Sequence, residues 1–293
     1  MAREARPHAP LDPLGEARRA RRAEAPIADI LRSAIGIDTQ GYTHQAKFWF
    51  PLHGGFESLV RGTVEGGGFV LSCNTRVERV ERAGTGFTVN GERFDLVVNT
   101  VPLPQIERAF ADLPDAIRAD VRALRPISLV TVLIGLKPGE PLPALSWIYL
   151  PFAEQGPANR VTYFSNYSPN VAPPGHASLM AEVTHRGELR PSREWVAGLV
   201  RQLGTAGVLD PRAVVHTDWS EVEYAYIDYD HQFDARIARV RSWFDTSGFV
   251  TFGRFGRYDY HNSDQCIARA MEVHAHVREI GKSGAPARPV FAP

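Results

Sequence analysis

The alternation of apolar and polar residues predicts a series of short strands between residues 66 and 101. The segments GGGFVLS, TRVERVERAG, GFTVNG and FDLVVNTVPLP are separated by Gly, Asn and Asp, as strands joined by tight turns are. TRVERVER alternates apolar with polar residues and therefore predicts a half-solvated strand. FDLVVNTV (94–101) is a continuous apolar run, which is typical of a strand buried on both faces.

A second β-rich region follows Pro126. Five segments, SLVTVLIGL, SWIYLP, RVTYFSN, SLMAEVTH and HTDWSEVEYAYI, are separated by turn residues and predict a largely antiparallel sheet. A strand (248–252), a turn and a helix then end the pattern. This order predicts an α/β fold of mixed α+β character, built from two interleaved subdomains.

Helical spacing of apolar residues predicts helices in the intervening segments. They are 28–37, 56–63, 105–124 (as one or two helices), 191–204, a helix marked by Phe233, Ile237, Val240 and Phe244, and 263–280. Ser192 is expected to cap the helix over 191–204. The predicted buried stripes are Trp195, Leu199 and Leu203 in that helix and Ile267, Met271 and His274 in the last one.

The composition narrows the class of protein. Lys plus Arg and Asp plus Glu both total 33 among 293 residues, so no net charge favours nucleic acid or an anionic membrane as a partner. The Arg-rich N-terminus is interpreted as a solvated arm, and no apolar run approaches the roughly 20 residues that span a bilayer. The two cysteines, Cys73 and Cys266, form no CxxC, which predicts neither a disulfide framework nor a metal site and favours the cytoplasm.

The common nucleotide-binding and catalytic motifs do not occur in the sequence. The stretches 66–68 (GGG) and 84–86 (GTG) come nearest to GxGxxG, but neither is followed by a third glycine or a helix, so both predict hairpin turns. No GxSxG, HExxH or EF-hand pattern is present. His274 and His276 are two residues apart, point to different faces of a helix and make a poor metal pair.

One stretch near the C-terminus, GRFGRYDYHNSDQCIARAMEV (253–273), has the features of an anion site. If Asn262 is the N-cap, Gln265 stands at N3, which is the spacing of a capping box. Gly253 and Gly256 allow the backbone to approach a ligand closely. A helix N-terminus after a strand and such a turn attracts a phosphate or the partly negative carbonyl edge of a flavin.

Side chains of the same stretch could add to this site. Arg254 and Arg257 supply fixed positive charge, and Tyr258 and Tyr260 supply hydroxyl groups that could reach a diphosphate. The alternative is a well-capped helix with exposed arginines. Spacing alone leaves both interpretations open.

Three stretches, FPLHGGFESL, VERVERAGTGFTVNGERFDLVVNTVPLP and GRFGRYDYHNSDQCIARAMEV, resemble the flavin amine-oxidase and protoporphyrinogen-oxidase clan. Within it they are most similar to the branch that contains UDP-galactopyranose mutase. RVTYFSNYSPNVAPPG (160–175) also resembles the sugar-side sheet of that branch, and the similarity runs from about Ala28 to Val277. The resemblance implies a partial FAD-binding, Rossmann-like domain interleaved with an antiparallel-sheet substrate domain.

The resemblance also implies roles for individual residues. Val77 would lie on the strand that contacts the adenine end of FAD, and Gly253 and Arg254 would lie beside the flavin and the substrate phosphates. The start of the last helix would face the isoalloxazine ring with Asn262, Ser263, Asp264 and Gln265. The substrate-binding candidates are Arg254, Tyr258, Tyr260, Tyr163, Asn166, Tyr224 and Tyr226. For the last four of these, packing in a sheet–helix interface is the alternative.

The chain departs from the family on its N-terminal side. Members of the family begin with a strand and a GxGxxG motif that bind the ADP portion of FAD, whereas this sequence resembles their C-terminal half to two-thirds. Ile227 also stands where the family usually has a proline. This departure leads to the hypothesis that a separately encoded chain supplies the missing half, or that the chain is a truncated product.

The expected organisation is an N-terminal arm with a helical segment (1–50), two FAD-domain segments (51–105 and 247–281), a substrate-side sheet with helices (106–246) and a loose tail (282–293). Three functions stay open. The first is an FAD-dependent oxidoreductase acting on a small molecule, and the second is a mutase-like isomerase acting on a nucleotide sugar. The third is a non-catalytic accessory subunit or gene remnant. No catalytic residue can be named from the sequence.

Overall fold

The computed structural model describes residue 28 and residues 48–283. The chain forms two units, Met1–Trp49 and Phe50–Pro293. In the first unit only Ala28, Phe48 and Trp49 are described, so the predicted helix over 28–37 lies outside the described residues beyond Ala28. Most of the predicted tail lies outside them too. The features below belong to the second unit.

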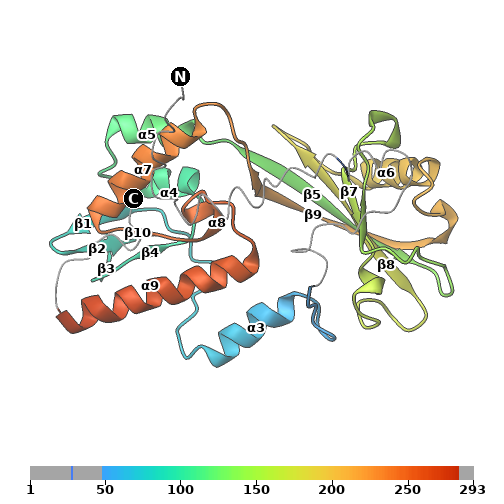
Figure 1. The fold of residues 1–293 in the computed structure, drawn as a ribbon, viewed down its shortest axis with the longest axis horizontal. Coiled ribbons are helices and arrows are strands. Elements are labelled where there is room, and N and C mark those ends of the chain that lie inside the picture. Colours follow the sequence, from blue (N-terminus) through green and yellow to red (C-terminus); the bar gives the residue numbers. More distant parts are fainter. Residues whose placement is uncertain (1–27, 29–47, 284–293) are drawn as a thin grey trace, which may run out of the picture. The chain divides into compact units, whose positions relative to one another are not determined.

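A five-stranded antiparallel sheet forms the middle of the second unit. Its strands are β5 (Pro126–Leu136), β6 (Trp147–Tyr149), β7 (Arg160–Thr162), β8 (Ala177–His185) and β9 (Val214–Ile227). Their order is β6-β7-β8-β5-β9, and every pair is antiparallel. The prediction of a largely antiparallel sheet after Pro126 is therefore confirmed (Figure 1).

Helix α6 (Arg193–Thr205) covers one face of this sheet and forms the first core with it. The Ser192 hydroxyl accepts a hydrogen bond from the Trp195 N–H at 3.2 Å, so the predicted N-cap is confirmed. Alternate strand residues and one helix stripe meet in this core, among them Val130, Val132, Ile134, Val161, Leu179, Ala181, Leu199 and Leu203. Three short 3-10 helices, η2 (Ala153–Gln155), η3 (Phe164–Asn166) and η4 (Pro211–Ala213), lie in the connections.

A second core joins segments that are far apart in the sequence. It contains helices α4 (Leu103–Ala109), α5 (Asp115–Arg122) and α7 (Phe233–Ser247) and the antiparallel sheet β1 (Val80–Ala83), β2 (Gly86–Val89) and β3 (Glu92–Phe94). Its centre is aromatic, with edge-on contacts of 5.0 to 6.4 Å between ring centroids among Phe87, Phe110, Phe244 and Phe249. The long strand β9 reaches this core with Ile227.

The two cores do not follow the order of the chain. The helices between 103 and 122 and between 233 and 247 pack with β1, β2 and residues 249–258. The assignment of residues 106–246 to the substrate side stays a prediction. The first core takes its residues from 130 to 214 only. Helix spacing predicted these elements correctly, whereas the core to which each belongs depends on long-range packing.

The continuous apolar run at 94–101 does not form the predicted strand buried on both faces. Phe94 ends β3, and after it only β4 (Val98–Asn99) is a strand within the run, which pairs in parallel with β10 (Val250–Thr251). Val98 is 38% exposed, whereas Asn99 is buried. A strand becomes buried on both faces when other elements cover both faces, and the described residues do not cover the Val98 side.

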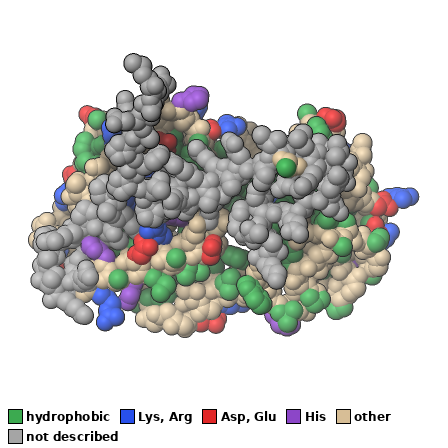
Figure 2. Space-filling model, viewed as in Figure 1, with side chains coloured by type: hydrophobic (Ala, Val, Ile, Leu, Met, Phe, Trp, Pro, Cys, Tyr) green, Lys and Arg blue, Asp and Glu red, His purple; other side chains and the backbone are tan. Residues whose placement is uncertain are grey.

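Two helices expose apolar side chains. Helix α3 (Glu57–Gly66) forms where the sequence predicts it but buries no residue, with Leu59 and Val60 exposed. In α9 (Ser263–Ser283) the predicted buried stripe is wrong, since Ile267 and Met271 are 66% and 71% exposed and His274 is exposed as well. Figure 2 shows hydrophobic side chains on the surface where α9 and α3 run. The period of a helix predicts which residues share a face, but not whether anything covers that face. No described helix is long and apolar enough to cross a membrane.

Candidate functional site

The site is built around α8 (Gly253–Gly256), a short helix that follows strand β10. Gly253 has φ +80°, a left-handed conformation that favours glycine. Gly256 packs against the end of β4, where a Cβ atom would lie 2.6 Å from the carbonyl oxygen of Asn99. α8 therefore lies at the carboxyl ends of the two parallel strands, which is where ligands bind in parallel sheets.

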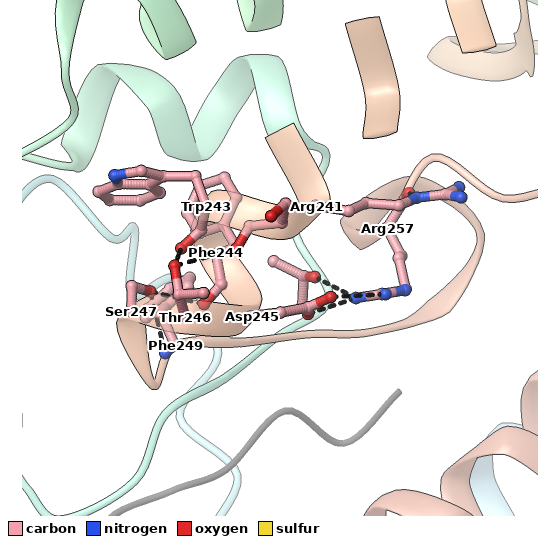
Figure 3. A network of polar contacts seen from close by, with 10 residues as sticks. Arg241, Trp243, Phe244, Asp245, Thr246, Ser247, Phe249 and Arg257 are labelled. Carbon is pink, nitrogen blue, oxygen red and sulfur yellow. Dashed lines mark hydrogen bonds and ion pairs between the residues drawn. The ribbon is translucent and has the colours of Figure 1, made fainter. Parts of the chain in front are cut away.

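Helix α7 holds this turn in place through two polar side chains, Arg241 and Asp245. The Arg257 guanidinium forms a two-pronged pair with the Asp245 carboxylate at 2.8 and 2.9 Å (Figure 3). It also donates to the Thr251 hydroxyl. Arg241 donates to the backbone carbonyls of Arg257 and Tyr258 at 2.9 and 2.8 Å. The charge of Arg257 is thus already paired inside the protein, which favours the structural interpretation for this residue over a ligand contact.

Tyr258 occupies the centre of this arrangement. It is fully buried in the second core and has φ +52°, which is an unusual conformation for a bulky residue. The Arg241 hydrogen bonds and a bond from the Asp259 N–H to the Arg254 carbonyl (2.8 Å) hold it there. Burial raises the pKa of its hydroxyl well above the ordinary value. Backbone strain of this kind concentrates at functional sites.

Arg254 lies in an aromatic enclosure on the other side of α8. Its guanidinium carbon is 4.8 Å from the ring centroid of Tyr260, 5.5 Å from that of Tyr226 and 5.6 Å from that of Phe255. Nη1 donates to the His261 carbonyl at 3.3 Å. Nε and Nη2 are buried and have no hydrogen-bond partner among the described residues. Such an arginine is suited to bind an anion.

A second charged pair lies near Tyr226, on the five-stranded sheet. Arg160 of β7 donates through Nη2 to Oε1 of Glu182 in β8 at 2.5 Å, and Glu182 is buried. Burial lowers the pKa of Arg160, but the hydrogen bond from Arg160 to Glu182 and the negative charge of Glu182 raise it, so that the pKa of Arg160 lies above the ordinary value. The pKa of Tyr226 is raised by burial and by Glu182, while Arg160 and Arg254 act in the opposite direction. All three charged groups therefore lie within electrostatic reach of the Tyr226 hydroxyl.

The start of α9 presents backbone N–H groups on an accessible surface. Gln265 Oε1 accepts a hydrogen bond from the Asn262 N–H at 3.0 Å. This is one of the two reciprocal hydrogen bonds that make up a capping box. Asn262, Ser263 and Asp264 are exposed. α9 is 21 residues long, so its N-terminal turn carries the positive end of a full helix dipole.

The other predicted site residues lie elsewhere. Val77 is half-buried against the second core, ahead of β1. Tyr163 is buried in the first core, and the Asn166 amide donates to the carbonyls of Pro143 and Leu145. For Tyr163 and Asn166, the packing alternative therefore fits what the structure shows.

Tyr224 and Tyr260 remain close to α8. The Tyr224 ring lies 6.2 Å from that of Phe255, and burial, followed by the Glu223 carboxylate, raises its pKa to about 12. Tyr260 is 40% exposed beside Arg254. Sequence reasoning singled out these rings and missed Arg160 and Glu182. The available signal was Glu182, a charged residue within the apolar run LMAEV of β8, whereas Arg160 at the start of β7 had no such signal.

This geometry belongs to a known class of fold. The chain is similar to the crystal structure of reduced UDP-galactopyranose mutase, with TM-score 0.76, 23% identity and 86% of this chain covered. It also resembles a protein described as a protoporphyrinogen oxidase from Exiguobacterium sp. 255-15 (TM-score 0.57, 20% identity, 76% covered). A third similar structure is the CLA-producing fatty acid isomerase from P. acnes (TM-score 0.55, 12% identity, 75% covered). The fold is therefore that of these flavoenzymes, with a Rossmann-like part and an antiparallel sheet.

The family follows from the sequence itself. Residues 27–245 match the model of the flavin containing amine oxidoreductases, and the chain belongs to that family. No curated protein matches it. The chain spans 57% of the mutase and 51% of each of the other two structures. The expected resemblance, fold class and FAD cofactor of the family are thus confirmed.

The residues at the carboxyl ends of β4 and β10 fit a flavin. An exposed helix N-terminus at α9 suits the electron-rich carbonyl edge of the ring, and Gly253 leaves open space, since a Cβ there would have no atom within 4 Å.

Proposed function

We propose that this chain forms part of an FAD-dependent oxidoreductase whose small-molecule substrate carries an anionic group bound by Arg254. The observation that supports the proposal most is that Arg254 has buried N–H groups with no hydrogen-bond partner in the described part of the chain. Arg254 lies among the rings of Tyr226, Phe255 and Tyr260. Family membership supports the cofactor. When bound, the flavin supplies the capacity to accept and return a hydride or electrons.

The role of the chain's own residues is binding and orientation. In this proposal the first turn of α9, with Asn262, Ser263 and Asp264, stabilises negative charge on the flavin edge, and Gln265 keeps that turn capped. Gly253 allows the ring to approach the backbone, and Val77 contacts the adenine end. Arg254 and Tyr260 hold the anionic end of the substrate. No side chain is assigned as acid or base.

A mutase-like isomerase acting on a nucleotide sugar is the second candidate. The feature that favours it is the combination of one guanidinium with neighbouring tyrosine hydroxyls at Tyr226 and Tyr260, because a diphosphate accepts hydrogen bonds from both kinds of donor. The two candidates share the anion site and differ in the chemistry performed beside it.

We also propose that polypeptide outside the described residues completes the FAD site. The β4–β10 pair has only two parallel strands and leaves Val98 partly exposed, although parallel strands are normally covered on both faces. The exposed Ile267 and Met271 on α9 give this polypeptide an apolar surface to pack against. On this proposal the segments around residues 51–105 and 247–281 serve the cofactor, and the five-stranded sheet serves the substrate. A cytoplasmic location remains a prediction from the two cysteines.

The first experiment measures flavin content. The purified chain is mixed with FAD and desalted, and the visible absorbance spectrum gives moles of flavin per mole of protein. Stoichiometric flavin supports the cofactor site and contradicts the need for further polypeptide. Flavin retained only after a GxGxxG-bearing polypeptide is added supports completion from outside. Absence of flavin under both conditions contradicts the proposal and favours an accessory protein.

The second experiment measures anion binding with UDP as the probe. Arg254→Lys keeps the charge but removes the planar fork of donors, so we expect UDP affinity to fall about tenfold or more by titration calorimetry. The matched control is Arg193→Lys, on the exposed surface of α6, which should leave the affinity unchanged. Equal affinities in all three proteins would contradict the role of Arg254. Substrate-dependent loss of flavin absorbance then distinguishes oxidation from isomerisation.

A further inference from the structure

His261 lies between the proposed anion site and a buried carboxylate. Its backbone carbonyl accepts the hydrogen bond from Arg254 Nη1 at 3.3 Å, and its imidazole Nε2 is 3.8 Å from Oδ2 of Asp259. The side chains of His261 and Asp259 are 10% and 7% exposed, so both groups lie inside the protein. One residue therefore connects Arg254 to an interior negative charge.

Helix α7 brings a positive charge to the same carboxylate. Arg241 Nη2 is 3.5 Å from Asp259 Oδ1. The Arg241 guanidinium also donates to the carbonyls of Arg257 and Tyr258, which fixes it in place, and an arginine keeps its charge at every physiological pH. Asp259 thus faces a permanent cation through one oxygen and His261 through the other.

The distance between His261 and Asp259 makes their interaction depend on the protonation of the imidazole. A separation of 3.8 Å is too long for a hydrogen bond, so a neutral imidazole gains little from the carboxylate. An imidazolium at the same place is attracted through its charge, and the attraction is strong because both groups are withdrawn from water. Histidine is also the type of side chain that gains or loses its charge near neutral pH.

The charges around His261 decide when this proton is favoured. Arg241 and Asp259 balance each other, and Arg254 adds a positive charge beside the His261 carbonyl. A proton on His261 adds a second net positive charge to this largely buried group. An anion held by Arg254 cancels one of the two, so the imidazolium is less unfavourable when the anion is bound.

Other ionisable groups of this region are less suited to the same role. They include Tyr226, Tyr258, Tyr260, Asp264 and the paired Arg257 and Asp245. Burial raises the pKa of Tyr226 and of Tyr258 above the ordinary value, so both hydroxyls keep their protons near neutral pH. Asp264 is exposed in the first turn of α9, where water and salt screen its charge.

We propose that His261 takes up a proton when an anion binds at Arg254, and that Asp259 stabilises the resulting imidazolium. The imidazole gains the proton from solvent, and no other bond changes. The proposal rests on the proposed function, because it requires the anion site at Arg254. It adds two residues, His261 and Asp259, to the site and makes the affinity for the anion depend on pH.

The first test counts protons by titration calorimetry of the full-length chain, with any flavin that it retains. The probes are sulfate and UDP-galactose, because neither gains or loses a proton near neutral pH. Titrations in two buffers of different ionisation enthalpy give the number of protons taken up on binding. We expect about half a proton or more per anion near pH 7, and an affinity that falls about three- to tenfold as the pH rises from about 6 to about 8.

The second test removes the imidazole. In His261→Gln the proton uptake should fall to near zero and the affinity should no longer change with pH, while the affinity near pH 8 stays within about twofold of the wild type. His216→Gln, on the exposed surface of β9, is the matched control and should keep both properties. His261→Phe serves instead if circular dichroism shows that His261→Gln does not fold.

A third variant tests the carboxylate. Asp259→Asn keeps the size of the side chain but removes the charge that stabilises the imidazolium, so we expect the proton uptake to fall to less than about half of the wild-type value. An unchanged uptake in a folded Asp259→Asn protein would contradict the role of Asp259.

Two further outcomes contradict different statements. If the wild type binds a probe without proton uptake, or if His261→Gln takes up as many protons as the wild type, the role of His261 is wrong and the anion site stands. If the wild type binds neither probe and does not bind UDP, the proposed function is wrong, and the proton uptake is wrong with it.

Discussion

The sequence GRFGR repeats one dipeptide, and the two copies have opposite surroundings in the folded chain. Gly256-Arg257 faces inward: the glycine touches the end of β4, and the arginine is paired with Asp245 of α7. Gly253-Arg254 faces the proposed site: the glycine has open space beside it, and the arginine keeps buried N–H groups free of partners among the described residues. One half of the turn therefore fixes the position of the other half.

This contrast has an energetic consequence. Side chains that complete the fold should dominate stability, while side chains that are left to bind a ligand should dominate affinity. Four substitutions test this contrast, ordered from the largest to the smallest expected change in the free energy of unfolding.

Asp245→Ala should cause the largest loss. Both partners of the Asp245–Arg257 pair are largely buried, with side chains 14% and 11% exposed, so the change removes the carboxylate that balances a buried guanidinium. We expect a loss of about 4 kcal/mol in urea denaturation. Glu57→Ala is the control, because it breaks an exposed pair with Arg61 on α3 and should cost less than about 0.5 kcal/mol. Similar losses for both variants would show that Asp245 does not hold the turn.

Gly256→Ala comes next. The new Cβ would lie 2.6 Å from the Asn99 carbonyl oxygen and 2.9 Å from the Thr100 Cα, and backbone atoms cannot rotate away as a side chain can. We expect a loss of about 2 kcal/mol, measured by the same denaturation. An unchanged midpoint would mean that α8 can move away from β4 at no cost.

Gly253→Ala should cost less, because only the backbone conformation opposes it. The glycine has φ +80°, and a Cβ would have no atom within 4 Å. We expect a loss of about 1 kcal/mol, with Gly253→Asn less affected because asparagine tolerates left-handed backbone better. A loss as large as that of Gly256→Ala would place a hidden contact at Gly253.

Arg254→Met should change stability least. It removes one 3.3 Å hydrogen bond to the His261 carbonyl and the ring contacts, but it also removes buried donors that have no partner among the described residues. These effects oppose each other, so we expect a change within about 0.5 kcal/mol in urea denaturation. A loss approaching that of Asp245→Ala would contradict the contrast and assign Arg254 to the fold.

Local features were predictable from the sequence. The Ser192 cap and the stripe of α7 depend on residues three or four positions apart, and both formed as expected. The antiparallel sheet was also predictable, because each strand has its own apolar segment and turn residues at its ends. The resemblance that indicated the family was carried by contiguous stretches.

Contacts between distant residues were not predictable. Arg160 and Glu182 are 22 residues apart and meet only because of the register of β7 and β8. Asp245, the partner of Arg257, lies in the preceding helix α7. The sequence alone therefore did not show that the charge of Arg257 is paired inside the protein. Ile267 and Met271 have the spacing of residues on the buried face of a helix, but both are exposed, so spacing alone gave the wrong prediction for them.

The sequence by itself determined most of the helices, the antiparallel sheet, the flavin family and the stretch around Arg254, because these follow from residues close together in the chain. Only the tertiary structure decided which arginine of GRFGR is paired with a carboxylate, and that the Glu182 carboxylate meets Arg160 on the five-stranded sheet. The physical reason is that a charged side chain is defined by the groups that surround it after folding, and those groups come from α7, β7 and β8.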